Sequence, residues 1–254
     1  MKCCLSSWTV QFISCGIDLF YHVVISHGQT EHLGKFPEGS VYVFDAITDA
    51  DMRVCAERSY PYVNVAQPGN RGMNRDAGLS YVLSSYAVSD DDVVEFFDGD
   101  RYPTTYRPEA VQELMDGHDI GCMLYSCDRD TRHGRIYVPL RGATLVDTGT
   151  LCNPFYSCGF AMKVGAIRKV MQFNGGSLFE HRFTRWGCED QYLGLVCERQ
   201  GIRVALTCET LLNGDVGGDQ FTHSDYRESL QQYVDIIREK GIAVRNEPRP
   251  SVEL

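Results

Sequence analysis

Short apolar runs alternate with helix-like stretches along the chain, and this alternation constrains the fold more than any other feature of the sequence. The runs are WTVQFIS (8–14), SVYVFDA (40–46), YVNVAQ (62–67), DVVEFFD (92–98) and IGCMLYS (120–126). Between them, residues 74–87 and 108–117 have the apolar spacing of helices. Strands that alternate with helices form a mostly parallel, covered sheet. The predicted fold class is therefore α/β, with a mixed, mostly parallel sheet flanked by helices.

The second half of the chain has a less regular pattern. It opens with RIYVPLRG (135–142) and continues through a Gly- and Cys-containing segment at 153–173. Apolar spacing then predicts a helix that begins near Glu189 and a strand at 202–206. A last helix is predicted at 224–241, with one apolar face that packs on the core.

Length and composition predict a single domain. The chain has 254 residues, of which 43% are hydrophobic, and this is enough material for one sizeable core. No repeat, low-complexity tract or long linker interrupts it. We therefore expect one domain over 1–254, in which 246–254 is a tail.

The cysteines and the N-terminus bear on location. The 11 cysteines include no CxxC pair, so the spacing typical of zinc sites is absent. Polar residues interrupt MKCCLSSWTVQFISCGID before a signal-peptide core or a membrane span of about 20 residues could form. The sequence thus predicts a soluble, cytoplasmic protein whose thiols are reduced.

The motif FFDGD places two carboxylates, Asp98 and Asp100, just after an apolar run. If the backbone stays extended, residues two apart point to the same side, so both could face one divalent cation. A hard ion such as Mg²⁺ or Mn²⁺ shares its coordination with substrate phosphates. A calcium loop is excluded because Pro103 stands where the sharp turn needs Gly. A plain Asp-Gly turn stays open as the alternative.

Three further segments of the chain can be compared with known motifs, and they accompany FFDGD in the same order as in those motifs. NRGMNRDAG (70–78) resembles the Asn-Arg-x4-Asn-x-Gly helix start of β-1,4-galactosyltransferases and related family 2 enzymes. FFDGD resembles the Asp-x-Asp motif of the same enzymes. WGCED (186–190) is similar to their Trp-Gly-Gly-Glu-Asp signature. His223 is placed like the histidine that completes their metal site. The chain thus resembles glycosyltransferases of the GT-A fold over about residues 40–225, although Cys188 replaces a glycine and Asp76 an asparagine.

The resemblance implies a donor site and a metal site. The residues expected to face the nucleotide sugar are Asp45, Arg71, Arg75, Asp98 and Trp186. Asp100 is the expected main ligand of Mn²⁺ or Mg²⁺, supported by Asp98 and His223. Ordinary roles stay open for several of these residues. Asp45, Asp49 or Asp51 could each cap a helix, Arg71 could be a surface residue at a helix start, His223 could precede a helix cap, and Trp186 could pack in the core.

The resemblance also implies the reaction. Residues 1–103 would bind the nucleotide sugar and residues 104–245 would bind the acceptor and catalyse transfer. Asp190 would remove the proton of an acceptor hydroxyl, Glu189 would orient the acceptor, and the metal would neutralise the departing diphosphate. Inversion at the anomeric carbon follows from direct displacement. The expected activity is an inverting, metal-dependent transfer of a hexose from a UDP-sugar; plain helix-start carboxylates are the alternative for residues 189–190.

Two other functions are compatible with parts of the sequence. A nucleotidyltransferase would need a Gly-rich, basic phosphate loop after the first strand, and SCGID (14–18) supplies none. A non-catalytic nucleotide-sugar-binding module stays open, although the intact Glu189-Asp190 pair argues against it. Acceptors range from surface glycan, protein and lipid-linked sugar to hydroxymethylated DNA bases. The net charge of −10 disfavours DNA, although the basic residues at 129–141 keep a DNA acceptor open as an alternative.

Overall fold

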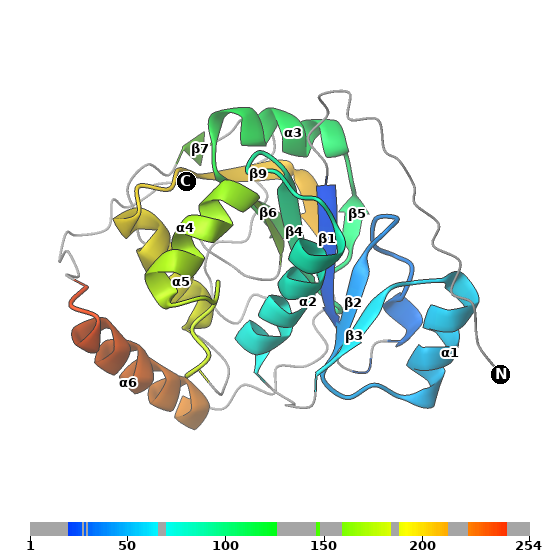
Figure 1. The fold of residues 1–254 in the computed structure, drawn as a ribbon, viewed down its shortest axis with the longest axis horizontal. Helices are drawn as coiled ribbons and strands as arrows, with labels where there is room; N and C mark the ends of the chain where they lie inside the picture. Colours follow the sequence, from blue (N-terminus) through cyan, green and yellow to red (C-terminus); the bar gives the residue numbers. More distant parts are fainter. Residues whose placement is uncertain are drawn as a thin grey trace.

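The computed structural model describes residues 20–26, 28, 30–65, 70–125, 146–147, 159–183, 188–212 and 223–242. Strands and helices alternate along most of this part of the chain (Figure 1). The apolar run at 8–14 and the segment at 135–142 lie outside the described residues.

The described strands form one mixed sheet. In chain order they are β1 (Phe20–Ser26), β2 (Val41–Phe44), β3 (Tyr62–Asn64), β4 (Val93–Asp98), β5 (Pro103–Thr105), β6 (Ile120–Tyr125), β7 (Val146–Asp147), β8 (Gly159–Lys163) and β9 (Val204–Leu212). Their spatial order is β3-β2-β1-β4-β8-β6-β9-β5, with β7 beside β9. Strands β3, β2, β1, β4, β6 and β9 run in one direction, and β8, β5 and β7 run against them. The predicted mixed, mostly parallel sheet is confirmed.

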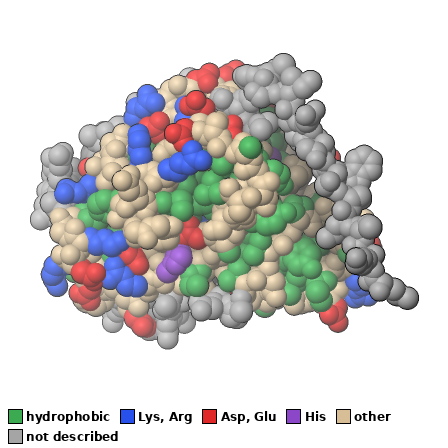
Figure 2. Space-filling model, in the orientation of Figure 1, with side chains coloured by type: hydrophobic (Ala, Val, Ile, Leu, Met, Phe, Trp, Pro, Cys, Tyr) green, Lys and Arg blue, Asp and Glu red, His purple; other side chains and the backbone are tan. Residues whose placement is uncertain are grey.

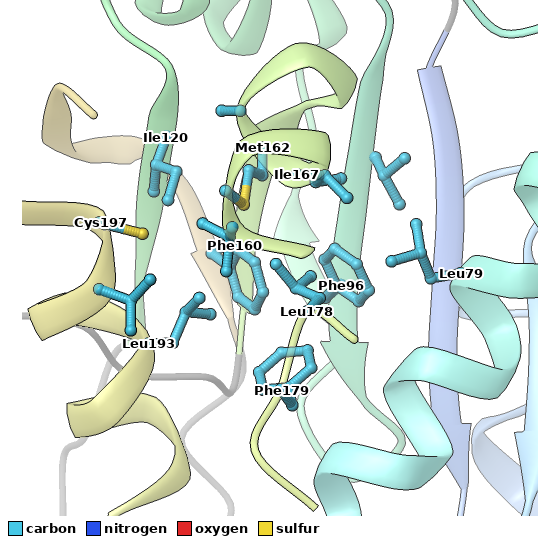
Figure 3. Close-up of a cluster of buried hydrophobic side chains, with 14 of the residues drawn as sticks. Leu79, Phe96, Ile120, Phe160, Met162, Ile167, Leu178, Phe179, Leu193 and Cys197 are labelled. Atoms are coloured by element: carbon cyan, nitrogen blue, oxygen red, sulfur yellow. The ribbon is translucent and has the colours of Figure 1, made fainter. Parts of the chain in front are cut away.

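Helices cover both faces of the sheet. The described ones are η1 (Thr30–His32), α1 (Asp49–Arg58), α2 (Arg71–Ser85), α3 (Pro108–Gly117), α4 (Val164–Asn174), α5 (Glu189–Arg199) and α6 (His223–Glu239). Helices α2, α4, α5 and α6 contribute to one buried cluster with the sheet, part of which Figure 3 shows around Phe96 and Phe160. Helices α1 and α3 contribute to a second cluster on the opposite face. A single domain with a covered sheet is thus confirmed.

The contact between α2 and the sheet depends on Gly78. A Cβ added there would lie 2.4 Å from Cγ1 of Val23 and 2.7 Å from Cγ2 of Val43. Because no side chain intervenes, the helix lies directly on β1 and β2. The start of α2 is thereby held against the ends of these strands, where ligands gather in sheets of this kind.

Most predicted elements are present, and several others were missed. The strands predicted within 40–46, 62–67, 92–98 and 120–126 correspond to β2, β3, β4 and β6, and the helix at 108–117 is α3. The helices predicted at 74–87, near Glu189 and at 224–241 correspond to α2, α5 and α6. The sequence interpretation missed β1, which lies between β2 and β4, and the pair β8–α4 within 153–173.

Candidate active site

The candidate site lies at the edge of the sheet where β2 and β4 end, one on each side of β1, and near the start of α2. Asp98 is the last residue of β4, and Asp45 follows the last residue of β2. Both strands pair in parallel with β1, so their carboxyl ends lie at the same edge of the sheet. Asp45 is 9% exposed and Asp98 is 6% exposed. The structure therefore brings two predicted donor-site carboxylates to one edge, close to the helix that carries the predicted arginines.

Asp45 does not cap the helix that follows it. The N-cap of α1 is Thr48, whose hydroxyl accepts a hydrogen bond from the amide of Asp51, and the Asp51 carboxylate accepts one in return from the amide of Thr48. This is a capping box, which satisfies two amides at the helix start. The capping alternative raised for Asp45 is thus wrong, and Asp51 takes part as the third helical residue.

Two arginines of α2 approach Asp98. Nη2 of Arg75 lies 2.7 Å from Oδ1 of Asp98, and Nη1 of Arg71 lies 3.6 Å from Oδ2. The Arg75 side chain is fully buried, and its guanidinium lies over the Phe179 ring at 5.3 Å from the centroid. Nη1 of Arg75 is 3.8 Å from Oε1 of Glu189. Arg75 therefore stands between the end of β4 and the start of α5.

The backbone turns after Asp98, which corrects one premise of the sequence interpretation. The amide of Gly99 donates to the carbonyl of Ile25, and the amide of Arg101 donates back to the carbonyl of Asp98 at 2.8 Å. Because Gly99 and Asp100 form this turn, Asp98 and Asp100 do not lie on one face of an extended strand. The Asp-Gly turn and a cation site are therefore not alternatives, since the turn presents Asp100 beyond the strand end.

The environment of Asp100 disfavours its negative charge. Burial, and then the nearby charge of Asp98, raise the pKa of the Asp100 carboxyl above its ordinary value, while Arg101 and Arg71 oppose this rise. Two adjacent carboxylates of which one is hard to ionise are the kind of donor set that a divalent cation stabilises. The chemistry of Asp98 and Asp100 thus fits a hard metal ion.

His32, which the sequence interpretation missed, holds this turn from the other side. Its Nδ1 lies 3.0 Å from the carbonyl oxygen of Gly99. Because a carbonyl only accepts hydrogen bonds, Nδ1 must carry the proton. The His32 ring also lies edge-on to Tyr102, with centroids 5.1 Å apart. Only the fold, which places η1 against the turn, relates a histidine at position 32 to Gly99.

We expect His32→Asn to retain most of the stability of the native protein, because the Asn amide nitrogen can occupy the position of Nδ1. His32→Gln places its donor one bond further out and is expected to lower the free energy of unfolding by about 1 kcal/mol, since the buried Gly99 carbonyl loses its partner. Urea denaturation of the two variants and the native protein measures this difference. Equal stability of the Asn and Gln variants would show that His32 does not hold the turn through Nδ1.

A second polar cluster joins α2 to the segment that precedes α5. The Asp76 carboxylate accepts hydrogen bonds from the amides of Leu178 (3.0 Å) and Phe179 (3.1 Å) and lies 2.6 Å from Nε2 of His181. The Asn70 side chain caps α2 and donates to the carbonyl of His181. An asparagine at position 76 would offer one acceptor oxygen instead of two. The aspartate that stands in place of the asparagine of the resembled motif therefore has three hydrogen-bond partners for its two carboxylate oxygens.

The same cluster predicts a pH dependence of stability. The hydrogen bond and charge of Asp76 raise the pKa of His181 above its ordinary value. A histidine whose folded pKa is raised contributes stability that is fully present below its unfolded pKa, about 6.5, and that is lost as the pH rises through the folded pKa. His181→Gln keeps a donor near Nε2 but has no charge. Since His181 is partly exposed, we expect it to lower the free energy of unfolding by about 0.5 to 1 kcal/mol at pH 6.

This difference between the native protein and His181→Gln is expected to shrink at pH 9. Urea denaturation of both proteins at the two pH values measures it, and Lys169→Gln, which removes a positive charge from an exposed position on α4, serves as a control outside the cluster. A difference that grew between pH 6 and pH 9 would contradict a charged His181-Asp76 pair.

The predicted catalytic pair lies at the start of α5. Glu189 and Asp190 are its first two residues, and Glu189 is 5% exposed. The residue before them, Cys188, has φ +72° and ψ −14°, a left-handed conformation that favours glycine. The resembled signature has glycine at this position, so the backbone keeps the glycine conformation although the side chain has changed. Burial, and then the carboxylates of Asp190 and Glu189, raise the pKa of the Cys188 thiol to about 12, so this cysteine is not a reactive nucleophile.

The remaining predicted residues are only partly located. His223 is the first residue of α6, and its side chain is not among those described. Trp186 and the basic residues at 129–141 lie outside the described residues. Within the described part of the chain, no three His, Cys, Asp or Glu side chains converge as a ready-made metal site. No helix in that part is both long and apolar enough to cross a membrane.

Solved structures with the same arrangement identify the fold. TarS of S. aureus, solved with UDP-GlcNAc as residues 1–349, superposes with a TM-score of 0.59 at 14% identity, over 86% of this chain and 66% of that one. The chain has the GT-A fold. Against the longer TarS structure the chain again aligns over 86% of its own length, but this corresponds to only 40% of that protein.

Two other GT-A structures are similar over most of this chain. Glucosyl-3-phosphoglycerate synthase of Mycobacterium tuberculosis, solved with Mn²⁺, UDP and glucosyl-3-phosphoglycerate, has a TM-score of 0.53 at 14% identity, over 89% of this chain and 81% of that one. The mannosyltransferase PcManGT of Pyrobaculum calidifontis, solved with GDP-Man and Mn²⁺, has a TM-score of 0.51 at 16% identity, over 90% and 65% of the two chains. No protein-family model matches the sequence, and a search of curated proteins finds no match.

Proposed function

We propose that the protein is a metal-dependent, inverting glycosyltransferase that moves a hexose from a nucleotide-diphosphate sugar to an acceptor hydroxyl. The observation that carries this proposal is the joining of two carboxylate pairs through Arg75. One pair, Asp98 and Asp100, lies at the end of β4, and the other, Glu189 and Asp190, begins α5. A direct displacement needs a donor anchor and a base near the same carbon, and Arg75 links the strand end that would carry the first to the helix start that would carry the second.

The donor half of the site would hold a nucleotide diphosphate and a cation. Asp45 at the end of β2 faces the nucleoside in this proposal, and Arg71 at the start of α2 lies near the diphosphate, where a guanidinium suits phosphate recognition. Asp100, with Asp98 and His223, would hold Mn²⁺ or Mg²⁺. When bound, this cation supplies charge neutralisation at the departing diphosphate. A UDP-sugar is the donor that we favour, and the UDP complexes of TarS and of glucosyl-3-phosphoglycerate synthase are consistent with it.

The acceptor half would supply the base. Asp190 is only partly buried, and its Oδ1 accepts a hydrogen bond from the amide of Gln191 at 2.7 Å. In the proposed reaction Asp190 removes the proton of an acceptor hydroxyl as the oxygen attacks the anomeric carbon, and the configuration at that carbon is inverted. Glu189, whose side chain is nearly buried beside Arg75, would help to orient the acceptor. Trp186 would stack on the sugar ring.

A panel of donors tests the proposal. UDP-glucose, UDP-galactose, UDP-N-acetylglucosamine and GDP-mannose are each incubated with the protein and Mn²⁺, or with EDTA, and release of the nucleotide diphosphate is measured. We expect at least one donor to be hydrolysed with Mn²⁺ and not with EDTA, because water can replace the acceptor. Absence of metal-dependent hydrolysis of every donor, together with absence of binding, would overturn the proposal and favour a protein that uses this fold for another purpose.

A further inference from the structure

Arg75 occupies an unusual position for a residue that the sequence places in the donor site. Its side chain has no exposed surface, and it lies between Asp98 and the ring of Phe179. A guanidinium that is fully enclosed has no face to offer to a phosphate or a base. A role in holding the site together is therefore more consistent with its position than direct contact with the donor.

The charges around Arg75 come from two separate elements. Asp98 belongs to β4 and lies 2.7 Å away, whereas Glu189 belongs to α5 and lies 3.8 Å away. Both carboxylates are nearly buried, at 6% and 5% exposure. In such surroundings the carboxylates depend on a nearby positive charge, because water cannot screen them. The guanidinium of Arg75 lies closer to Asp98 than to Glu189, so in this structure it interacts more strongly with Asp98.

The neighbours of these two carboxylates are the groups that matter for the reaction. Asp98 is followed two residues later by Asp100, the proposed metal ligand, and Glu189 is followed directly by Asp190, the proposed base. The planar guanidinium can serve two carboxylates at once, and the Phe179 ring restricts its plane. Any change in the charge on Asp98 is thus transmitted to Glu189 through a single rigid group.

We propose that Arg75 is a positioning residue that couples occupation of the donor site to the placement of the Glu189-Asp190 helix start. This inference rests on the proposed function. A divalent cation held by Asp98 and Asp100 would compete with Arg75 for the Asp98 carboxylate, so the guanidinium would interact more strongly with Glu189. The start of α5 then becomes more ordered when the donor half is filled. Coupling of this kind between two sites is commonly worth a 5- to 150-fold change, so about fivefold is the smallest effect expected.

Amide hydrogen exchange detects this coupling without an acceptor. The native protein is compared with and without UDP and Mn²⁺, following peptides that cover 93–101 and 188–199. We expect exchange to slow in both peptides, by about fivefold or more for the amides at the start of α5. Arg75→Lys keeps the charge, but one ammonium cannot bridge both carboxylates, so only the peptide over 93–101 should respond. Arg168→Lys, the same change at an exposed arginine of α4, is the matched control.

Each outcome of this experiment is informative. Protection at 188–199 that persists unchanged in Arg75→Lys would overturn the coupling, as would a native protein that binds UDP without any change at 188–199. If Arg75→Lys does not fold, Glu189→Gln replaces it, because it weakens the same link while keeping the Arg75-Asp98 pair, and it should also abolish the response at 188–199. A native protein that binds neither UDP nor GDP with Mn²⁺ would instead overturn the proposed function, and this inference with it.

Discussion

Replacement of Asp190 by asparagine is expected to lower the rate of metal-dependent donor hydrolysis and of sugar transfer by about 10²- to 10⁴-fold, the usual contribution of a general base. The side chain keeps its shape but can no longer take the proton from the attacking oxygen. Affinity for UDP with Mn²⁺ is expected to stay within a few-fold, because Asp190 lies in the first turn of α5 and does not belong to the β4 turn. Initial rates over a range of donor concentrations separate kcat from KM.

The matched control for this change is Asp235→Asn, which removes the same charge from an exposed position on α6. It should leave the rate unchanged. An Asp190→Asn variant with native kcat, or with its whole defect in KM, would contradict the assignment of Asp190 as the base. A product that retains the anomeric configuration of the donor would contradict it as well.

Replacement of Asp98 by asparagine is expected to lower the free energy of unfolding by about 3 to 5 kcal/mol, because it removes one carboxylate of a buried pair and leaves the Arg75 charge poorly compensated. Asp100→Asn is the matched comparison. Burial and the charge of Asp98 raise the pKa of Asp100, so the ionised carboxylate destabilises the folded protein at pH 7. A neutral amide at this position should therefore not lower the free energy of unfolding. Both variants are measured by urea denaturation in EDTA at pH 7.

The two aspartates are thus expected to differ in the metal-free protein. With Mn²⁺ and UDP added, the native protein should become more stable, and Asp100→Asn should lose most of this gain, since ligands that bind only the folded state stabilise it. Equal loss of stability in Asp98→Asn and Asp100→Asn without metal would contradict the separate role of Asp98. A full ligand effect in Asp100→Asn would contradict its role as a metal ligand.

The motifs of the site could be located from the sequence because each lies within a short segment. FFDGD and the Glu189-Asp190 pair fall at the end of a strand and the start of a helix, as their patterns predicted. The residues between motifs were harder to assign. β1 was missed because Phe20–Ser26 is a short apolar run with a histidine inside it, and no local signal shows that it lies between β2 and β4.

Long-range contacts explain the other differences. Position 32 approaches Gly99, and position 75 approaches Glu189, only once the sheet has brought these segments together. The interpretation of the sequence also took residues 98–100 to be extended, whereas the hydrogen bonds of Gly99 and Arg101 close a turn there. Charge and motif spacing identify which residues carry chemistry, but burial decides whether an arginine meets a ligand or another side chain.

The most direct test of the proposed donor site is a calorimetric titration of UDP into the protein, with Mn²⁺ in one experiment and EDTA in the other. We expect saturable binding with Mn²⁺ that is weakened at least tenfold by EDTA and by Asp100→Asn, because the cation links the diphosphate to the β4 turn. Binding that is equally tight with EDTA, or no binding of UDP in either buffer, would contradict a metal-anchored nucleotide-diphosphate site at Asp98 and Asp100.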